Sequence, residues 1–122
     1  MSRPRRIDPE ETDLRSWLEV GEDVLAVLIG QGASLIATER RVVLLRDRSS
    51  TRPRTGVRSW PFDRIVTVSL SEPHRGQARI LLRTGRMPWE AVSMFFDGQD
   101  WHEAESFVAV IRQRQRQRRS LN

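Results

Sequence analysis

Between residues 23 and 96 the chain is a succession of short apolar runs separated by turn residues, and this pattern limits the fold more than any other feature. The runs are rich in valine, leucine and isoleucine, as β-strands are. They cover residues 23–29, 33–38, 41–46, 57–60, 65–72, 77–84 and 90–96. Glycine-containing turns join several of them, which favours antiparallel neighbours. The sequence therefore predicts a mainly β protein of seven short antiparallel strands, arranged as a sandwich or a barrel.

The hydrophobic period changes after residue 96, where the pattern becomes that of an amphipathic helix. Apolar residues recur at helical spacing on one face: Trp101, Ala104, Phe107, Val108 and Ile111. Asp97 is a suitable N-terminal cap for this helix. Seven strands followed by one such helix indicate a barrel whose open end the helix covers, which gives an α+β architecture.

A second, shorter helix is expected near the N-terminus. Asp8 can cap it and Pro9 suits its first turn. Leu14, Trp17 and Leu18 then lie on one face, so this helix is expected to pack on the domain.

Composition restricts the class of protein. A chain of 122 residues fits one domain. It has no cysteine, which excludes disulfides, thiolate metal sites and cysteine nucleophiles. No apolar run approaches the ~20 residues that span a bilayer, and no apolar segment follows the basic N-terminus as it does in a secretory signal. These features predict a cytoplasmic protein.

Two local motifs lie in the middle of the strand region. One is the Thr-Glu-Arg-Arg corner at residues 38–41, and the other is Trp-Pro-Phe-Asp-Arg-Ile at residues 60–65. Their order resembles the bacterial pleckstrin-homology-like (PH-like) domains, in which a Thr-x-Arg-Arg corner and a Pro-aromatic-Asp-x-Ile turn recur. The resemblance covers residues 18–111. It implies a strongly bent, seven-stranded antiparallel barrel capped by a C-terminal α-helix, and a binding or assembly module rather than an enzyme.

The expected organisation has three parts. Residues 1–7 form a disordered basic arm, residues 8–111 form the PH-like domain, and residues 112–122 form an Arg/Gln-rich C-terminal extension.

The Thr-Glu-Arg-Arg corner allows two interpretations. Arg40 and Arg41 could hold an anionic group. Alternatively, Thr38 bonds the turn backbone while one arginine pairs with an acid such as Asp63 across the sheet, and this structural interpretation is favoured. Asp63 is also expected to cap the turn after Pro61.

All 21 basic residues are arginine, and codon bias in a GC-rich genome is the simplest explanation. Their positions are more informative than their number, because they cluster in one loop and in the C-terminal tail. The loop candidates for contact with an anion are Arg46, Arg48, Arg52, Arg54 and Arg58. A solvated loop that maintains solubility is the alternative. The first hairpin loop, residues 30–33, has no basic residue, so selective recognition of inositol phosphates is not expected.

The C-terminal tail contributes three further candidates for contact with an anion, Arg112, Arg114 and Arg116. The tail is polar on every side if it continues the helix, and nothing in it is expected to pack on a core. It could be a frayed solvated extension, a contact for nucleic acid or acidic lipid, or an interface between subunits. It lacks the aromatic residues with which single-strand binders stack bases, so sequence-specific recognition is not expected.

Met87 and Trp89 are candidates for a protein contact, since they lie in a predicted turn where an aromatic side chain can be exposed. Packing of Trp89 on its own hairpin is the alternative. The other tryptophans lie on apolar helix faces or beside the Pro61 turn, where they are expected to be core residues.

Catalytic patterns are missing from the sequence. His74 and His102 are the only histidines, and neither belongs to a metal-binding or nucleophile motif. No cofactor, metal or small-molecule substrate is therefore expected. The function predicted from the sequence is a non-enzymatic module that binds a protein partner or forms a homo-oligomer. The alternative is peripheral electrostatic binding to an anionic membrane or nucleic acid through the loop and tail arginines.

Overall fold

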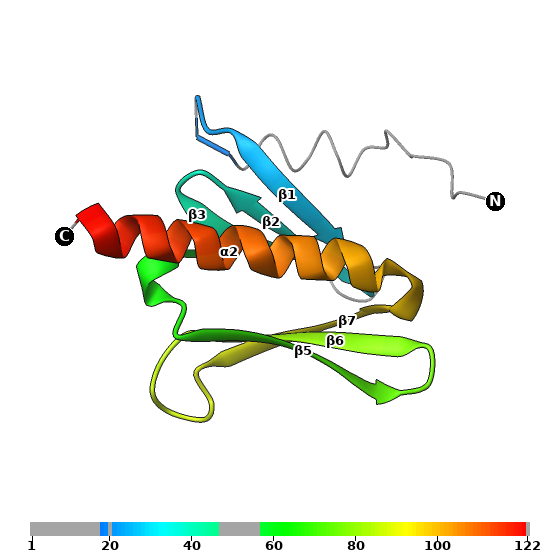
Figure 1. The fold of residues 1–122 in the computed structure, drawn as a ribbon. Coiled ribbons are helices and arrows are strands. Elements are labelled where there is room, and N and C mark those ends of the chain that lie inside the picture. The colour runs from blue at the N-terminus through cyan, green and yellow to red at the C-terminus, as the bar shows by residue number, and fades with distance from the viewer. Residues whose placement is uncertain (1–17, 20, 47–56, 122) are drawn as a thin grey trace.

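The computed structural model describes residues 18–19, 21–46 and 57–121. Two antiparallel sheets form the body of the protein, and one long helix lies across the opening between them (Figure 1). The first sheet has the order β1-β2-β3-β4, with β1 at Val24–Ile29, β2 at Ala33–Thr38, β3 at Arg41–Arg46 and β4 at Val57–Pro61. The second has the order β5-β6-β7, with β5 at Thr67–His74, β6 at Gln77–Arg83 and β7 at Ala91–Asp97. The helix α2 spans Trp101–Leu121.

The structure confirms the seven predicted strands and the C-terminal helix, with small differences at their ends. β5 begins two residues later than predicted, and a 3-10 turn, η1 at Phe62–Arg64, lies between β4 and β5. A second 3-10 turn, η2 at Gly98–Asp100, precedes α2, and the Asp97 carboxylate accepts a hydrogen bond from the Gln99 N–H there. The predicted N-terminal helix and residues 1–7 lie outside the described residues.

The core lies between the inner faces of both sheets and the apolar face of α2. Leu35 and Leu44 contribute from the first sheet, Ile80 and Phe96 from the second, and Phe107 from the helix, and all are buried. β6 and β7 alternate buried and outward-facing positions, as the pleat requires, whereas every position of β2 is buried. Burial of one helix face against both sheets holds the two layers together.

The first hairpin turn also joins the sheets directly. The Gln31 N–H donates to the Phe95 carbonyl at 2.8 Å, which ties the β1–β2 turn to β7. A Cβ added to Gly30 would lie 2.6 Å from the Met94 side chain, so a larger residue there would require this flexible side chain to shift. Gly32 follows with a φ of 74°, a conformation that favours glycine in the same turn.

Candidate interaction surfaces

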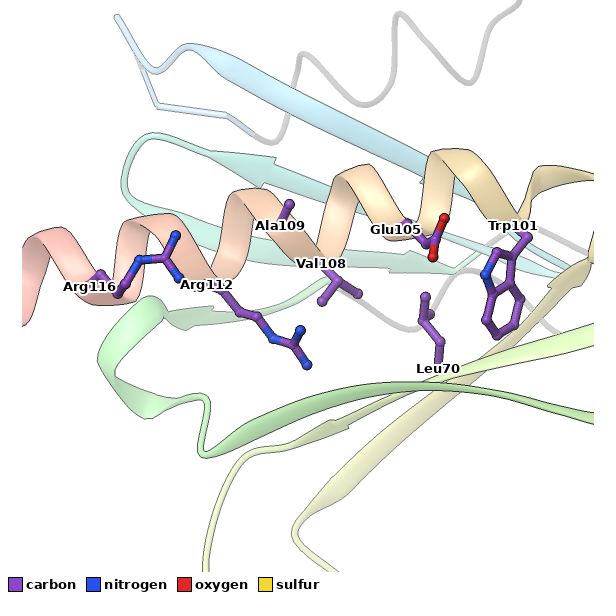
Figure 2. A pocket seen from close by; sticks show the side chains of 7 residues that line it. All are labelled: Leu70, Trp101, Glu105, Val108, Ala109, Arg112 and Arg116. Carbon is purple, nitrogen blue, oxygen red and sulfur yellow. The ribbon is translucent and has the colours of Figure 1, made fainter.

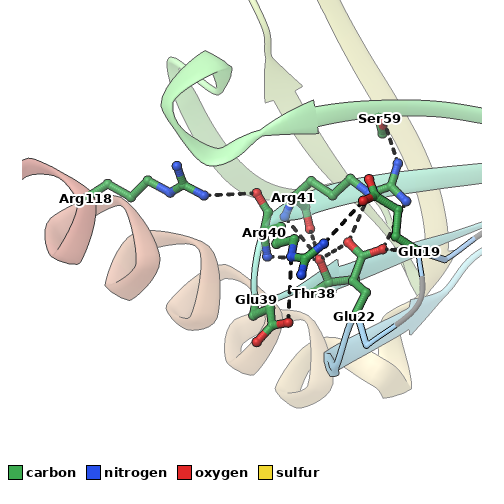
Figure 3. A network of polar contacts seen from close by, with 8 residues as sticks. All are labelled: Glu19, Glu22, Thr38, Glu39, Arg40, Arg41, Ser59 and Arg118. Carbon is green, nitrogen blue, oxygen red and sulfur yellow. Dashed lines mark hydrogen bonds and ion pairs between the residues drawn. The ribbon is translucent and has the colours of Figure 1, made fainter.

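The Thr-Glu-Arg-Arg corner is the centre of a polar network, which we call the corner network (Figure 3). The Thr38 hydroxyl accepts hydrogen bonds from the N–H groups of Arg40 and Arg41, both at 3.1 Å. The same hydroxyl donates to the Glu22 carboxylate at 2.7 Å. Arg41 donates from Nε and Nη2 to the two oxygens of Glu22, both at 3.0 Å. The corner is therefore tied to the segment that precedes β1.

Hydrogen bonding determines the ionisation of Glu22 and Arg41. The two bonds from Arg41, with smaller contributions from Thr38 and the Glu19 N–H, lower the pKa of Glu22 from 4.5 to about 2, although burial opposes the shift. The same contact raises the pKa of Arg41. Glu22 is therefore a carboxylate, and Arg41 is a fixed cation with its charge already compensated.

The corner network confirms the structural interpretation, in which Thr38 bonds the turn backbone and an arginine pairs with an acid. The identity of that acid differs from the prediction. The sequence pointed to Asp63, whereas the partner of Arg41 is Glu22. Asp63 lies within η1, and its side chain is exposed. The N-cap residue of η1 is Pro61, and no side-chain capping hydrogen bond forms there. The predicted capping role of Asp63 is therefore also wrong. The ladder pairs Val24 with Thr38, which brings Glu22 beside the corner. A hairpin register drawn from the Gly30–Gly32 turn could have indicated this neighbour.

Arg40 lies on the outer side of the corner. It pairs with Glu19 at 3.2 Å and with Glu39 at 3.8 Å, and its side chain is half exposed. Ion pairs with this exposure contribute little to stability because water and salt screen them.

The free side of β1, which we call the β1 edge, is strongly apolar. β1 is a terminal strand of its sheet and pairs only with β2 among the described strands. Four of its large apolar side chains are exposed, and Ile29 is 52% exposed. They are Val24, Leu25, Val27 and Ile29. No charged residue lies within this strand. Edge strands usually carry charges, prolines or covers that prevent pairing with another chain.

β5 is the corresponding terminal strand of the second sheet, and α2 covers it with polar side chains. Arg112 donates from Nη2 to the Val68 carbonyl at 3.2 Å. Gln115 donates from Nε2 to the Ile65 carbonyl at 2.7 Å and to the Phe62 carbonyl at 3.3 Å. The sequence missed these contacts because it treated the Arg/Gln tail as unable to pack. The tail instead docks through hydrogen bonds to backbone oxygens.

A pocket of about 480 Å³ lies between α2 and β5 (Figure 2). Leu70, Trp101 and Val108 form its apolar part, while Arg112 and Arg116 stand at one end. Neither His74 nor His102 lines it. The pocket therefore combines an apolar surface with two arginines and the carboxylate of Glu105, and neither histidine contributes to it.

The structure places the candidate loop arginines at one end of the first sheet. Arg46 is exposed at the end of β3, and the Arg58 guanidinium stacks over the Trp60 ring with 5.0 Å to its centroid. Arg48, Arg52 and Arg54 lie outside the described residues.

The candidate tail arginines lie on α2, toward the other end of that sheet. Arg112 bonds the Val68 carbonyl and Arg114 bonds the Gln117 amide oxygen, while Arg116 is exposed on the helix. Near the end of α2, Arg118 bonds the Arg40 carbonyl at the β2–β3 corner. Arg46 and this corner lie at opposite ends of β3, a strand of this length spanning roughly 17 Å. The described arginines of loop and tail therefore do not converge on one anion.

The candidate protein contact in the β6–β7 loop is exposed. Trp89 is 76% exposed and Met87 is also exposed, so Trp89 does not pack on its own hairpin. Whether this pair contacts a protein stays a prediction.

Two features are missing from the described residues, namely a membrane-spanning helix and a metal-binding cluster. No helix there has the length and hydrophobicity needed to cross a membrane. No group of three or more histidine, aspartate or glutamate side chains there could hold a metal ion.

Comparisons with known proteins reveal similarity in structure alone. No protein-family model and no curated protein matches the sequence. A DUF1696 family protein with a pleckstrin-homology domain from Shewanella loihica PV-4 has a TM-score of 0.61 and 13% identity, covering 87% of this chain and 98% of that chain. A pleckstrin homology domain from Shewanella amazonensis SB2B has a TM-score of 0.61 and 16% identity, covering 87% of this chain and 97% of that chain. Together with the seven strands and the capping helix, these similarities show that the chain has the bacterial PH-like fold that its two motifs indicated.

Proposed function

We propose that this chain is a non-enzymatic binding module that associates with a second copy of itself through the β1 edge, in a cytoplasmic setting. The observation that carries the proposal is that one side of β1 is unpaired among the described strands and that β1 bears a row of exposed apolar side chains. A strand from another chain that pairs there would extend the sheet and bury those side chains together.

The similarity to PH-like domains supports a binding role in a coarser sense. It concerns the fold, and it leaves the partner to be identified by experiment. A strand from a different protein could pair with the same backbone groups of β1. Association with a different protein should therefore be tested next.

Sedimentation velocity at increasing protein concentration tests the association. We expect the wild-type chain to form an oligomer that persists in high salt, because apolar burial and backbone hydrogen bonds are insensitive to screening. Val27→Glu should shift the chain to the monomer, since its carboxylate would be carried into the interface.

Val66→Glu is the matched control for this experiment. Val66 is 56% exposed and precedes β5, on a different part of the surface. A wild-type chain that stays monomeric at every concentration contradicts self-association. Equal dissociation by both variants contradicts the assignment to β1.

Electrostatic attachment to an anionic membrane or nucleic acid is the second candidate function. The observation in its favour is the continuation of α2 to Leu121, which presents Arg114, Arg116 and Arg118 on an ordered helix. Binding of this kind should weaken steeply with added salt.

Co-sedimentation with anionic vesicles across a salt series tests this candidate, with nucleic acid as a second probe. Arg114, Arg116 and Arg118 should be changed to alanine together, rather than removed by truncation at Ile111, because truncation also removes the structural contacts of Arg112 and Gln115. Binding that the triple variant retains in full would contradict a role for the tail.

A further inference from the structure

The outer face of the second sheet carries a row of side chains that the proposed function does not use. Successive residues of a strand point to opposite faces. Ala78, Ile80 and Leu82 of β6 are fully buried in the core. Arg79 and Arg83 therefore point outward, and both are half-buried.

The strand register defines the neighbours of these two arginines. Arg79 lies opposite Ser71 on β5 and Phe95 on β7, and Arg83 lies opposite Thr67 and Ala91. Leu81 stands between the two arginines, with Ser69 and Ser93 beside it. The face therefore consists of two guanidinium groups, a set of small hydroxyl residues and three apolar side chains, those of Leu81, Ala91 and Phe95. We call it the arginine face.

Charge on the arginine face is not compensated by acids of the same face. Among the outward-facing residues that are paired between β5, β6 and β7, Asp97 is the sole acid. It lies opposite Gln77, at the end of the face away from Arg83. The two arginines are four residues apart, which in a strand is ~13 Å. Arg75 and Arg86, in the turns before and after β6, extend the positive charge at both ends.

The two guanidinium groups also have unused donors. The Nε atoms of Arg79 and Arg83 are shielded from solvent and have no hydrogen-bond partner within the described part of the chain. A shielded donor without an acceptor is unfavourable. Arg83 donates from Nη2 to the Arg86 carbonyl at 3.1 Å, and an incoming oxygen anion reaches either Nε atom only when its side chain turns outward.

Aromatic surface adjoins these cations. Phe95 is 37% exposed directly beside Arg79, and Trp89 is exposed in the loop that follows Arg83. Exposed aromatic rings interleaved with arginines on a rigid surface are the arrangement that binds unpaired bases and the phosphates between them.

We propose that the arginine face binds single-stranded nucleic acid. Arg79 and Arg83 contact phosphates along the strand, and Phe95 stacks on a base. The serine and threonine hydroxyls are hydrogen-bonding groups for sugar and phosphate oxygens. A bilayer is the less suitable partner, because these arginines are half-buried in the middle of a sheet rather than on a protruding loop.

Fluorescence anisotropy with labelled poly-dT and poly-U oligonucleotides across a salt series tests the proposal. We expect binding to both probes at low salt. Arg79→Ala with Arg83→Ala should weaken binding and reduce the slope of log K against log salt by about 1.4, since each lost phosphate contact removes about 0.7. Phe95→Leu should weaken binding about tenfold and leave that slope unchanged, because stacking involves no charge.

Arg40→Ala with Arg64→Ala is the matched control. It removes the same charge from the β2–β3 corner and from η1, away from the arginine face, and leaves the tail arginines intact. The proposal is overturned if neither oligonucleotide binds at low salt, or if the control lowers affinity and slope as much as the face variant. Binding to anionic vesicles without binding to either oligonucleotide would also overturn it, in favour of a membrane.

An NMR titration of the unmodified chain keeps the test valid if a variant fails to fold. The proposal predicts the largest amide shifts at Arg79, Leu81, Arg83 and Phe95 on addition of poly-dT. Shifts confined to α2 or β1 would contradict it.

Discussion

β1 and β5 are both terminal strands of antiparallel sheets, yet their free sides differ. Along β5, the side chains of Arg112 and Gln115 bond the carbonyls of Val68 and Ile65. Along β1, apolar side chains are exposed and the strand has no charged residue. A sheet edge covered by hydrogen-bonding side chains is a poor template for another strand, whereas an uncovered apolar edge is a good one. The comparison shows that α2 side chains bond backbone carbonyls of the β5 edge, whereas β1, on which α2 also packs, exposes apolar side chains.

The largest expected effect comes from removing the helix anchor on which this difference depends. Phe107→Ala deletes a fully buried ring of α2 and should destabilise the protein by about 3–5 kcal/mol in urea unfolding. The hydrogen bonds from Arg112 and Gln115 of α2 to the β5 edge should then weaken as well. Phe95→Ala is the control, because Phe95 faces outward and should cost much less. Equal losses in the two variants would contradict the central position of Phe107.

The second prediction concerns the corner network, which fixes the chain just before β1. The pKa of Glu22 is lowered to about 2 in the folded state, so the bond to Arg41 stabilises the protein above pH 4.5. That stability is lost as the pH falls from 4.5 toward 2. Glu22→Gln should cost about 2 kcal/mol at pH 7, a value discounted for the water that reaches Arg41.

The free energy of unfolding, measured across this pH range, checks the direction of the predicted pH dependence. The difference between wild type and Glu22→Gln should shrink as the pH falls through the window. Glu19→Gln is the control, because its exposed pair with Arg40 should contribute less than about 0.5 kcal/mol. A difference that stays constant from neutral pH to pH 2 would show that the Glu22 carboxylate is not responsible.

The third prediction converts the closed edge into an open one. Arg112→Ala with Gln115→Ala frees the carbonyls of Val68 and Ile65, at a cost of about 1–2 kcal/mol for the lost hydrogen bonds. The variant should remain folded and associate more strongly than the wild type in sedimentation velocity, because β5 can then pair with another chain. Arg114→Ala with Gln117→Ala, on the same helix, should leave association unchanged. No gain in association by the Arg112/Gln115 variant would mean that these side chains do not protect the edge.

Much of the fold could be predicted from local sequence, because its turns carry strong signals. The bounds of β2 and β3 match the prediction, since the Gly30–Gly32 turn and the Thr-Glu-Arg-Arg corner delimit them. The sequence placed the boundary of the domain at Ile111 and left open whether the helix continues, and α2 extends to Leu121. The contacts of its last turns are hydrogen bonds to backbone oxygens, and no hydrophobic period indicates them.

The surfaces were harder to predict because they depend on register. Glu22 meets Arg41 only when β1 pairs with β2, and Arg79 meets Phe95 only when β6 pairs with β7. The exposed apolar side chains of β1 were difficult to predict for the same reason. A nearly continuous apolar run such as that of β1 is typical of a strand covered on both faces, whereas the structure exposes four of its large side chains. Composition predicted a strand but could not indicate that the strand lies at an edge.

Amide hydrogen exchange of the wild-type chain at low and high concentration tests the central claim most directly. Association through β1 should slow exchange in residues 24–29 as concentration rises, while exchange in β5 stays unchanged because α2 already covers that edge. Exchange in β1 that is independent of concentration, or slowing confined to β5, would contradict the claim.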